Sequence, residues 1–217
     1  MLKLNFFASN QNHPKILCLG AHPDDIEIGC GGTLLRMIDE VPNACFYWVV
    51  FSGTEQRQKE AIESAEIFLK KLENKNIIIK HFQESYFPFI GAQIKNYFEE
   101  LKVEFSPDVV FTHYKKDAHQ DHRLISDLTW NTFRDHFILE YEIPKYDGDL
   151  STPNAYVDLG ERHVNKKILH ILDVFETQKG RSWFTEDTFR SILRLRGIES
   201  NAQGKYAEGF YCRKIVF

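Results

Sequence analysis

The stretch ILCLGAHPDDIEIGCGGT, residues 16–33, decides how this 217-residue chain is interpreted. It opens with an apolar run typical of a buried strand and continues directly into His22 and the adjacent carboxylates Asp24 and Asp25. Two neighbouring carboxylates repel one another and are costly to remove from water. A divalent metal ion would offset both costs, so the stretch indicates a metal site at the mouth of a strand.

Strand-length apolar runs alternate with helical patterns over the first two thirds of the chain. The expected strands are 15–20, 45–52, 76–80 and 108–113, and the expected helices are 33–41, 55–72 and 90–105. This alternation predicts an α/β fold, Rossmann-like and doubly wound, with a mostly parallel sheet covered by helices on both faces.

The length and the 43% hydrophobic content suit a single domain over residues 1–217. Within it, residues 139–160 mix Pro, Gly, Asp and Tyr, and we expect them to form an active-site rim. Residues 161–217 should supply C-terminal helices and a terminal strand.

The charge balance narrows the class of partner. A formal net charge of −4 argues against a nucleic-acid or membrane-surface binder, which usually carries a basic excess. The N-terminus lacks the pattern of a signal peptide, and no run of about 18 apolar residues occurs. We therefore expect a cytoplasmic protein with a small-molecule partner; the sequence is compatible with a homo-oligomer but does not specify one.

The cysteines form no CxxC pair and no disulfide framework, so all are expected to be reduced thiols. They are Cys18, Cys30, Cys45 and Cys212. Core packing is the favoured interpretation for Cys30, with soft metal ligation as the alternative because the residue follows the acidic motif.

A second polar cluster, DAHQDHR at residues 117–123, follows another apolar strand and begins a predicted helix. His119 and His122 are three residues apart and share a helix face. One of them could bind a metal while the other stands over a substrate, and Asp121 could accept a ring N–H from a histidine. In doubly wound folds such loops lie beyond the carboxyl ends of the strands, where ligands bind. Three such ligands and an open position are typical of catalytic zinc.

The glycines of GCGGT do not form the GxGxxG dinucleotide motif, and carboxylates beside them would repel a pyrophosphate. Gly29, Gly31 and Gly32 are expected to let the backbone turn and pack closely before a helix that starts at Thr33. Phosphate binding at that helix start is the weaker alternative.

Both motifs, AHPDDIEIGCGGT at 21–33 and PDVVFTHYKKDAHQDHR at 107–123, resemble those of the PIG-L/LmbE family of zinc-dependent N-acetylglucosaminyl deacetylases. The resemblance extends through SGTEQRQKEAIESAEIFL, at 52–69, to FETQ at 175–178 and KYAEGF at 205–210. It implies an LmbE-like hydrolase that removes the acetyl group from an N-acetylglucosamine-type amino sugar, present as a glycoside, a thiol precursor or a nucleotide-linked form.

The resemblance also implies a role for each motif residue. The implied zinc ligands are His22, Asp25 and His122. Asp24 would be the general base, His119 would polarise or protonate the amide, and Asp121 would support a histidine. Fe²⁺ or Mn²⁺ could occupy the same ligand set. Candidate sugar-binding residues are Arg57, Tyr114, Tyr141, Glu142 and Asn154.

Two alternative functions follow from the same residues. The first is an amidase that acts on another amide, such as a thiol conjugate. The second is a non-catalytic, metal-dependent sugar-binding or regulatory protein. The presence of Asp24 favours catalysis, because binding alone would not need a proton acceptor beside the metal.

Overall fold

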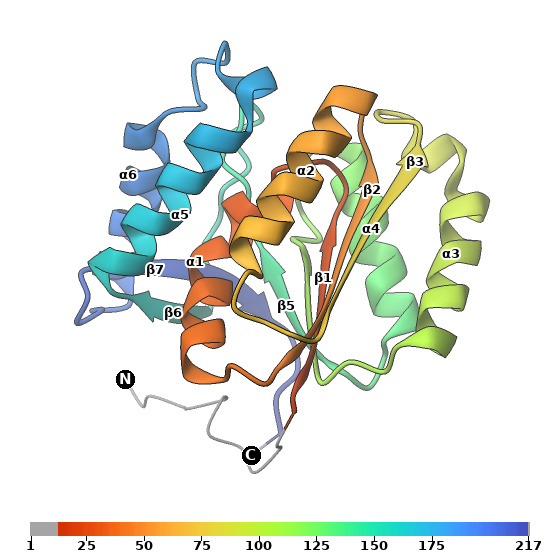
Figure 1. Cartoon of the computed structure of the whole chain (residues 1–217), viewed down its shortest axis with the longest axis horizontal. Helices are drawn as coiled ribbons and strands as arrows, with labels where there is room; N and C mark the ends of the chain where they lie inside the picture. The colour runs from red at the N-terminus through yellow and green to blue at the C-terminus, as the bar shows by residue number, and fades with distance from the viewer. Residues whose placement is uncertain (1–12, 217) are drawn as a thin grey trace.

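The computed structural model describes residues 13–216, so the N-terminal stretch in which we saw no signal peptide lies mostly outside the described residues. Seven strands form one mixed sheet in the order β3-β2-β1-β4-β5-β7-β6 (Figure 1). The strands are β1 (Lys15–Gly20), β2 (Cys45–Ser52), β3 (Lys75–Phe82), β4 (Val109–His113), β5 (Phe137–Tyr141), β6 (Ala155–Leu159) and β7 (Tyr206–Cys212). The α-helices are α1 (Asp25–Glu40), α2 (Glu55–Phe68), α3 (Gly91–Glu104), α4 (Gln120–Thr132), α5 (Glu161–Val174) and α6 (Glu186–Glu199). In residues 13–216 there are also two 3₁₀ turns, η2 (Phe87–Phe89) and η3 (Glu176–Gln178).

The first five strands are parallel, and the chain reverses its direction of travel across the sheet between β1 and β4. β1 pairs with β2 on one side and with β4 on the other. The carboxyl ends of these two central strands therefore form the topological switch point, which is the usual ligand site of a doubly wound sheet. The loops after β1 and β4 carry the two polar motifs, so the topology places them side by side.

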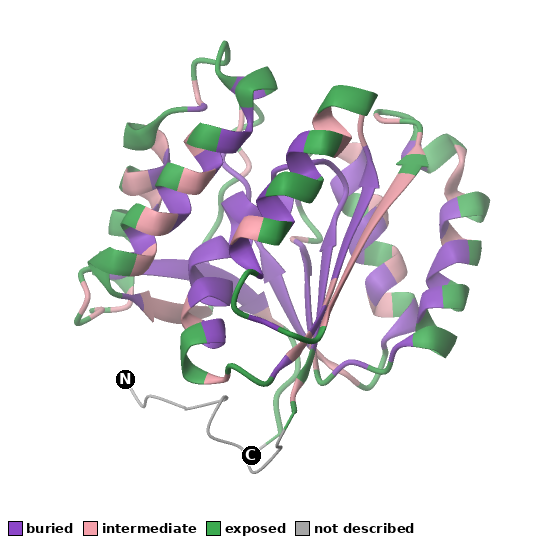
Figure 2. Ribbon diagram, in the orientation of Figure 1, coloured by how far each residue is buried: buried purple, intermediate pink, exposed green. Residues whose placement is uncertain are grey.

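Helices cover both faces of the sheet, as the alternation of apolar runs predicts. Ile16 and Cys18 of β1 point to the layer formed by α1, α2, α5 and α6, whereas Leu17 and Leu19 point to α3 and α4. Figure 2 shows the central strands buried between these layers, with exposed residues on the outer sides of the helices. In the part of the chain that the structure describes, no helix is long and apolar enough to cross a membrane.

Helix α1 begins at Asp25, eight residues before the start expected at Thr33. The glycines that we took for a turn lie inside the helix, because they permit close packing rather than breaking it. A Cβ atom on Gly29 would lie 2.1 Å from the Tyr141 ring, and one on Gly32 would lie 2.5 Å from Leu159. Helix α1 thus packs closely against the sheet. This packing places the carboxylates at the N-terminus of the helix in the site.

A buried ion pair from two other elements contacts the backbone of the same helix. Lys167 of α5 and Glu208 of β7 are 2.7 Å apart and almost fully buried. Lys167 donates to the Ile28 carbonyl, and Glu208 accepts from the backbone N–H groups of Gly32 and Thr33. Gly32 and Thr33 lie inside α1 and not at its start, so the helix start at which a phosphate was the weaker expectation does not exist there, and these contacts fix α1 to the C-terminal elements.

The last third of the chain extends the sheet. β7 pairs antiparallel with β5 and β6, so residues 139–141 and 155–159 of the expected rim are strand. The segment 142–154 between them is the connecting loop, which we call the rim loop. All four cysteines are free, and Cys18 and Cys30 are buried.

Candidate metal centre

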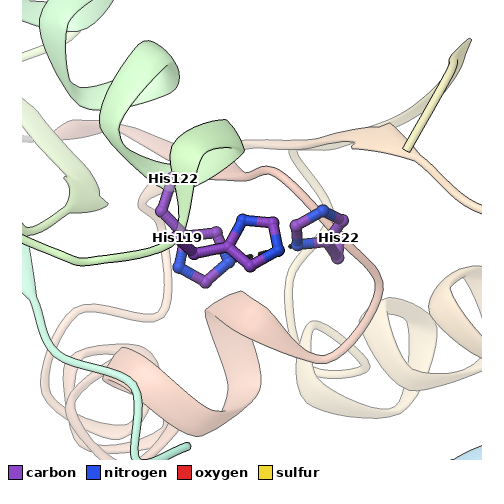
Figure 3. A group of neighbouring side chains, drawn as sticks. All are labelled: His22, His119 and His122. Atoms are coloured by element: carbon purple, nitrogen blue, oxygen red, sulfur yellow. Dashed lines mark hydrogen bonds between the residues drawn. The ribbon is translucent and has the colours of Figure 1, made fainter. Parts of the chain in front are cut away.

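Three side chains from the two motif loops bring donor atoms together at the switch point. Nδ1 of His22 lies 3.1 Å from Nε2 of His122. The carboxylate of Asp25 lies 3.4 Å from the first of these atoms and 3.5 Å from the second. Figure 3 shows the imidazoles of His22 and His122 facing each other, with His119 beside them. The loop after β1 and the start of α4 thus meet although their residues are a hundred positions apart.

The outer nitrogen of each imidazole is held by a carboxylate. Nε2 of His22 lies 3.1 Å from Asp121, and Nδ1 of His122 lies 2.9 Å from Asp117. A carboxylate accepts the ring proton and so fixes the tautomer. The inner nitrogens, Nδ1 of His22 and Nε2 of His122, face the Asp25 carboxylate, and both would offer a lone pair to a cation that displaces the second ring proton of His22.

This donor set fits a small divalent cation. Tetrahedral zinc with ligand bonds of about 2.0–2.1 Å places its ligand atoms about 3.3 Å from one another. The observed spacings of 3.1 to 3.5 Å are close to that value. Among the described residues, two overlapping sets of side chains have donor atoms close enough together to hold a cation, and His122 belongs to both. They are His22 with His119 and His122, and Asp25 with His113 and His122.

Burial and neighbouring groups shift the pKa values of His22, His122 and Asp25. Burial alone would lower the pKa of His22, but hydrogen bonds to Asp121 and Asp25 raise it to about 10. Burial and the neighbouring His113 lower the pKa of His122 to about 3. Although burial opposes it, the imidazoles of His122 and His113 hold the pKa of Asp25 well below its ordinary value. At neutral pH, His22 is thus protonated on both ring nitrogens, whereas His122 is neutral.

His119 caps helix α4 and remains half-buried at the mouth of the site. Its Nδ1 accepts the backbone N–H of Asp121 at 3.2 Å. Burial and the nearby His22 lower its pKa, so the ring is neutral at pH 7. A neutral imidazole whose Nδ1 accepts carries its proton on Nε2. His119 can therefore donate a hydrogen bond to a ligand.

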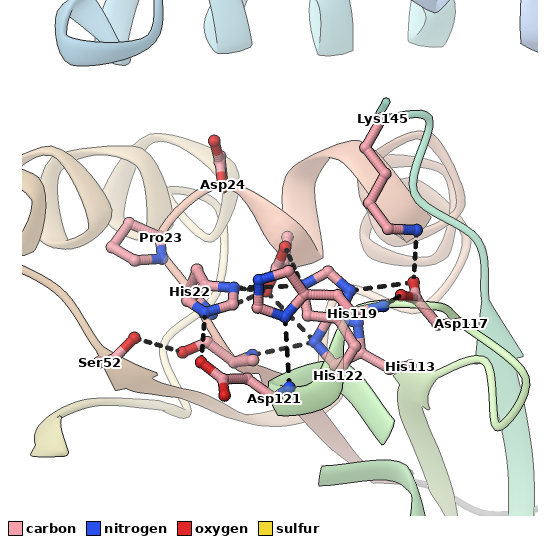
Figure 4. Close-up of polar contacts among 12 residues, drawn as sticks. His22, Pro23, Asp24, Ser52, His113, Asp117, His119, Asp121, His122 and Lys145 are labelled. Carbon is pink, nitrogen blue, oxygen red and sulfur yellow. Dashed lines mark hydrogen bonds and ion pairs between the residues drawn. The ribbon is translucent and has the colours of Figure 1, made fainter. Parts of the chain in front are cut away.

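Asp24 is the N-cap of α1 and has a left-handed backbone, with φ of 90°. It is 5% exposed, and its carboxylate lies 3.4 Å from the Arg57 guanidinium. Figure 4 shows this carboxylate pointing away from the imidazoles. Burial raises the pKa of Asp24 well above its ordinary value, and Arg57 opposes that effect. A carboxyl group of this kind holds its proton to a higher pH than an ordinary aspartate, as acid–base groups of active sites often do.

The expected sugar-binding residues are engaged in contacts within the protein. Arg57 contacts Glu84 at 2.9 Å and the Pro23 carbonyl, rather than a glutamate of its own helix. Tyr114 stacks on Tyr211 with ring centroids 3.6 Å apart.

The three candidates nearer the rim loop are also occupied. Tyr141 is fully buried and donates to the Leu19 carbonyl. Glu142 forms a bidentate ion pair with Arg196 at 2.7 and 2.8 Å. Asn154 pairs with the backbone of Cys212. These contacts shape the elements beside the site.

Sequence reasoning missed three residues of the centre: His113, Asp117 and Lys145. His113 ends β4 at the switch point, is fully buried and stacks on His122 with ring centroids 3.9 Å apart. Its position at the end of a predicted strand could have identified it as a candidate site residue. Asp117 accepts the hydrogen bond from His122, and Asp121 is the hydrogen-bond partner of His22. No local pattern marks Lys145, because its contact depends on the tertiary fold.

Solved structures support the fold over most of the chain. A conserved protein, TT1542, from Thermus thermophilus is 22% identical, with a TM-score of 0.74 over 93% of this chain and 95% of that one. The N,N'-diacetylchitobiose deacetylase from Pyrococcus horikoshii is also 22% identical, with a TM-score of 0.61 over 92% and 83%. GalB, the 4-carboxy-2-hydroxymuconate hydratase from Pseudomonas putida, is 14% identical, with a TM-score of 0.74 over 94% and 98%. The same fold thus occurs in proteins described by different reactions.

The family comparison is more specific. A family model described as PIG-L, GlcNAc-PI de-N-acetylase, matches residues 17–133, which is more than half of the chain. The matched region contains both motif loops and all the side chains that could hold a cation, which are His22, Asp25, His113, His119 and His122. The chain therefore belongs to the PIG-L family.

Proposed function

We propose that this protein is a metal-dependent hydrolase that removes the N-acetyl group from an N-acetylglucosamine-type amino sugar. One observation carries the proposal: three lone-pair donors, from His22, Asp25 and His122, converge within 3.5 Å while both outer ring nitrogens are held by carboxylates. Membership of the PIG-L family supports N-deacetylation of a sugar-type substrate.

His22, Asp25 and His122 would hold the ion, and their nitrogen and oxygen donors suit Zn²⁺, with Fe²⁺ or Mn²⁺ as alternatives. When bound, such an ion polarises a carbonyl and lowers the pKa of a coordinated water to about 7. The surroundings favour a cation, because Asp24, Asp25, Asp117 and Asp121 all lie at the centre.

The remaining groups would move protons during amide hydrolysis. Asp24 would take a proton from the attacking water, for which its carboxylate, now facing Arg57, would turn toward the centre. His119 would donate its Nε2 proton as a hydrogen bond to the amide oxygen, where negative charge develops; one such donor is often worth about 3 kcal/mol. The C–O bond forms, the C–N bond breaks, and Asp24 or His119 returns a proton to the leaving amine.

Sugar recognition would involve groups at the mouth of the centre. Of the candidates from the sequence, Tyr114 belongs to the second motif, and Arg57 contacts Pro23 and Asp24 of the first. We assign Tyr141, Glu142 and Asn154 an indirect contribution through the shape of the rim loop, because their polar groups are already bonded.

A screen for acetate release tests the proposal. Purified protein would be incubated with N-acetylglucosamine, its glycosides, N,N'-diacetylchitobiose, a nucleotide-linked form and a thiol conjugate, while bound metal is measured in parallel. Acetate release from a sugar, lost on chelation and restored by metal, supports the proposal. Turnover of the thiol conjugate alone would indicate the amidase alternative. Binding of a sugar without hydrolysis would indicate the non-catalytic alternative.

A further inference from the structure

The carboxylate of Asp117 connects several parts of the candidate centre. Its Oδ2 accepts from Nδ1 of His122 at 2.9 Å, and its Oδ1 accepts from the backbone N–H of His119 at 2.7 Å. Asp117 is 3% exposed, so these contacts are shielded from water. One carboxylate therefore orients both the imidazole assigned to the metal and the residue assigned to the amide oxygen.

The rim loop supplies the cation that holds Asp117 in place. Nζ of Lys145 lies 3.0 Å from the same Oδ2 atom, as Figure 4 shows. Lys145 also contacts Asp149 of the rim loop at 2.5 Å, and Asp149 accepts the backbone N–H of Ala118 at 2.6 Å. Two links thus connect the rim loop to the loop that carries Asp117.

The burial of Lys145 indicates a specific purpose for its charge. Its side chain is 10% exposed, and removing an ammonium group from water is costly unless carboxylates surround it. The lysine bonds to the same oxygen that orients His122, so the rim loop and that imidazole are linked through Asp117. An ion pair that only stabilised the rim loop would require Asp149 alone.

We propose that Lys145 is a positioning residue: through Asp117 it fixes the orientation and the Nδ1-protonated tautomer of His122, and it couples the rim loop to the metal centre. This inference rests on the proposed function for its catalytic consequence, but its geometric part holds for the metal-free protein. Groups that orient metal ligands typically change metal affinity by 10- to 100-fold when they are lost.

The test compares Lys145→Met with Lys116→Met, a matched control at an exposed lysine on the neighbouring loop. Metal affinity is measured by competition with a chelator, and kcat and KM are measured on the substrate that the screen identifies. We expect Lys145→Met to weaken metal binding at least tenfold and to lower kcat, while Lys116→Met behaves as wild type. Lys145→Arg should recover part of both, because it keeps the charge.

A second measurement does not depend on metal or substrate. In metal-free, ¹⁵N-labelled protein, the ring signals of His122 should report a proton on Nδ1 in wild type, and this preference should weaken in Lys145→Met. If Lys145→Met fails to fold, Lys145→Gln replaces it in all measurements. An Nε2-protonated His122 in wild type, or a Lys145 variant with control-like metal affinity, would overturn the inference. Failure of wild type to bind metal would instead overturn the proposed function.

Discussion

Nδ1 of His22 and Nε2 of His122 lie 3.1 Å apart, with the Asp25 carboxylate within 3.5 Å of both. Asp121 and Asp117 hold the outer ring protons, so three lone-pair donors face one another in a buried space. In the metal-free protein, hydrogen bonds to Asp121 and Asp25 raise the pKa of His22 to about 10 against the effect of burial, whereas burial and His113 lower that of His122 to about 3. A divalent cation would satisfy all three donors at once.

Removal of one donor should therefore release the metal. We expect His122→Ala to lower the metal content of purified protein below about a tenth of wild type, as measured by elemental analysis after dialysis, because only two of the proposed ligands remain. His81→Ala, at an exposed histidine, serves as the control. Retention of one tightly bound ion per chain in His122→Ala would contradict the ligand assignment.

The sequence predicted the fold well because the strands are buried on both faces and appear as continuous apolar runs. The bounds of β1 and β2 match the expected ranges, and those of β3 and β4 differ by one or two residues. The start of α1 was wrong, because glycines interrupt the helical pattern. Their packing against Tyr141 and Leu159 depends on distant parts of the chain, which no local pattern reveals.

The centre was only partly predictable for the same reason. The motifs that follow strands indicated His22, one of the two aspartates and one of the two histidines of the second motif, since topology brings such loops together, and the family resemblance implied Asp25 and His122. The carboxylates that contact the two histidines could not be predicted. That Asp117 contacts His122 and Asp121 contacts His22 depends on how α4 packs. Lys145 is further removed, because the rim loop reaches Asp117 only after β5 and β6 have joined the sheet.

Asp24 can be separated from metal binding by a single substitution. We expect Asp24→Asn to retain metal and to lose at least about a hundredfold in the rate of acetate release, the lower range for general acid–base catalysis. Asparagine tolerates the left-handed backbone of this position, so the local fold is kept. The rate is compared with that of Asp187→Asn, at an exposed aspartate of α6. Near-normal turnover would remove Asp24 from the mechanism.

The contact of α1 with the sheet predicts an unusual effect of alanine. In most helices Gly→Ala is stabilising, but a Cβ atom at Gly29 would lie 2.1 Å from the fully buried Tyr141 ring, which cannot move away. We expect Gly29→Ala to lower the unfolding free energy by about 2 kcal/mol or more, seen in urea titration. Gly180→Ala, where no atom lies within 4 Å, is the control and should be nearly neutral. A Gly29→Ala protein as stable as that control would mean that α1 does not lie this close to the sheet.

Glu27 predicts how stability varies with pH in the metal-free protein. The side chain is 1% exposed, and burial raises its pKa to about 7, with a smaller opposing effect of the Ser64 hydroxyl. In the unfolded chain a glutamate titrates near 4.3. Between these values the folded state binds more protons, so the unfolding free energy falls as the pH rises, and above about pH 7 the loss is complete.

Replacement of Glu27 by glutamine removes that titration. The shift corresponds to about 4 kcal/mol, so Glu27→Gln should gain up to that amount over wild type between pH 4 and pH 8 in urea unfolding with a chelator present. Asp24, whose pKa is also raised, contributes a slope of the same sign to both proteins, somewhat smaller in Glu27→Gln because the charge of Glu27 adds to that rise. Glu63→Gln, at an exposed glutamate of α2, should follow the wild-type curve. Parallel curves for Glu27→Gln and wild type would mean that Glu27 is ionised in the folded protein across this range, because water or a cation reaches its carboxylate.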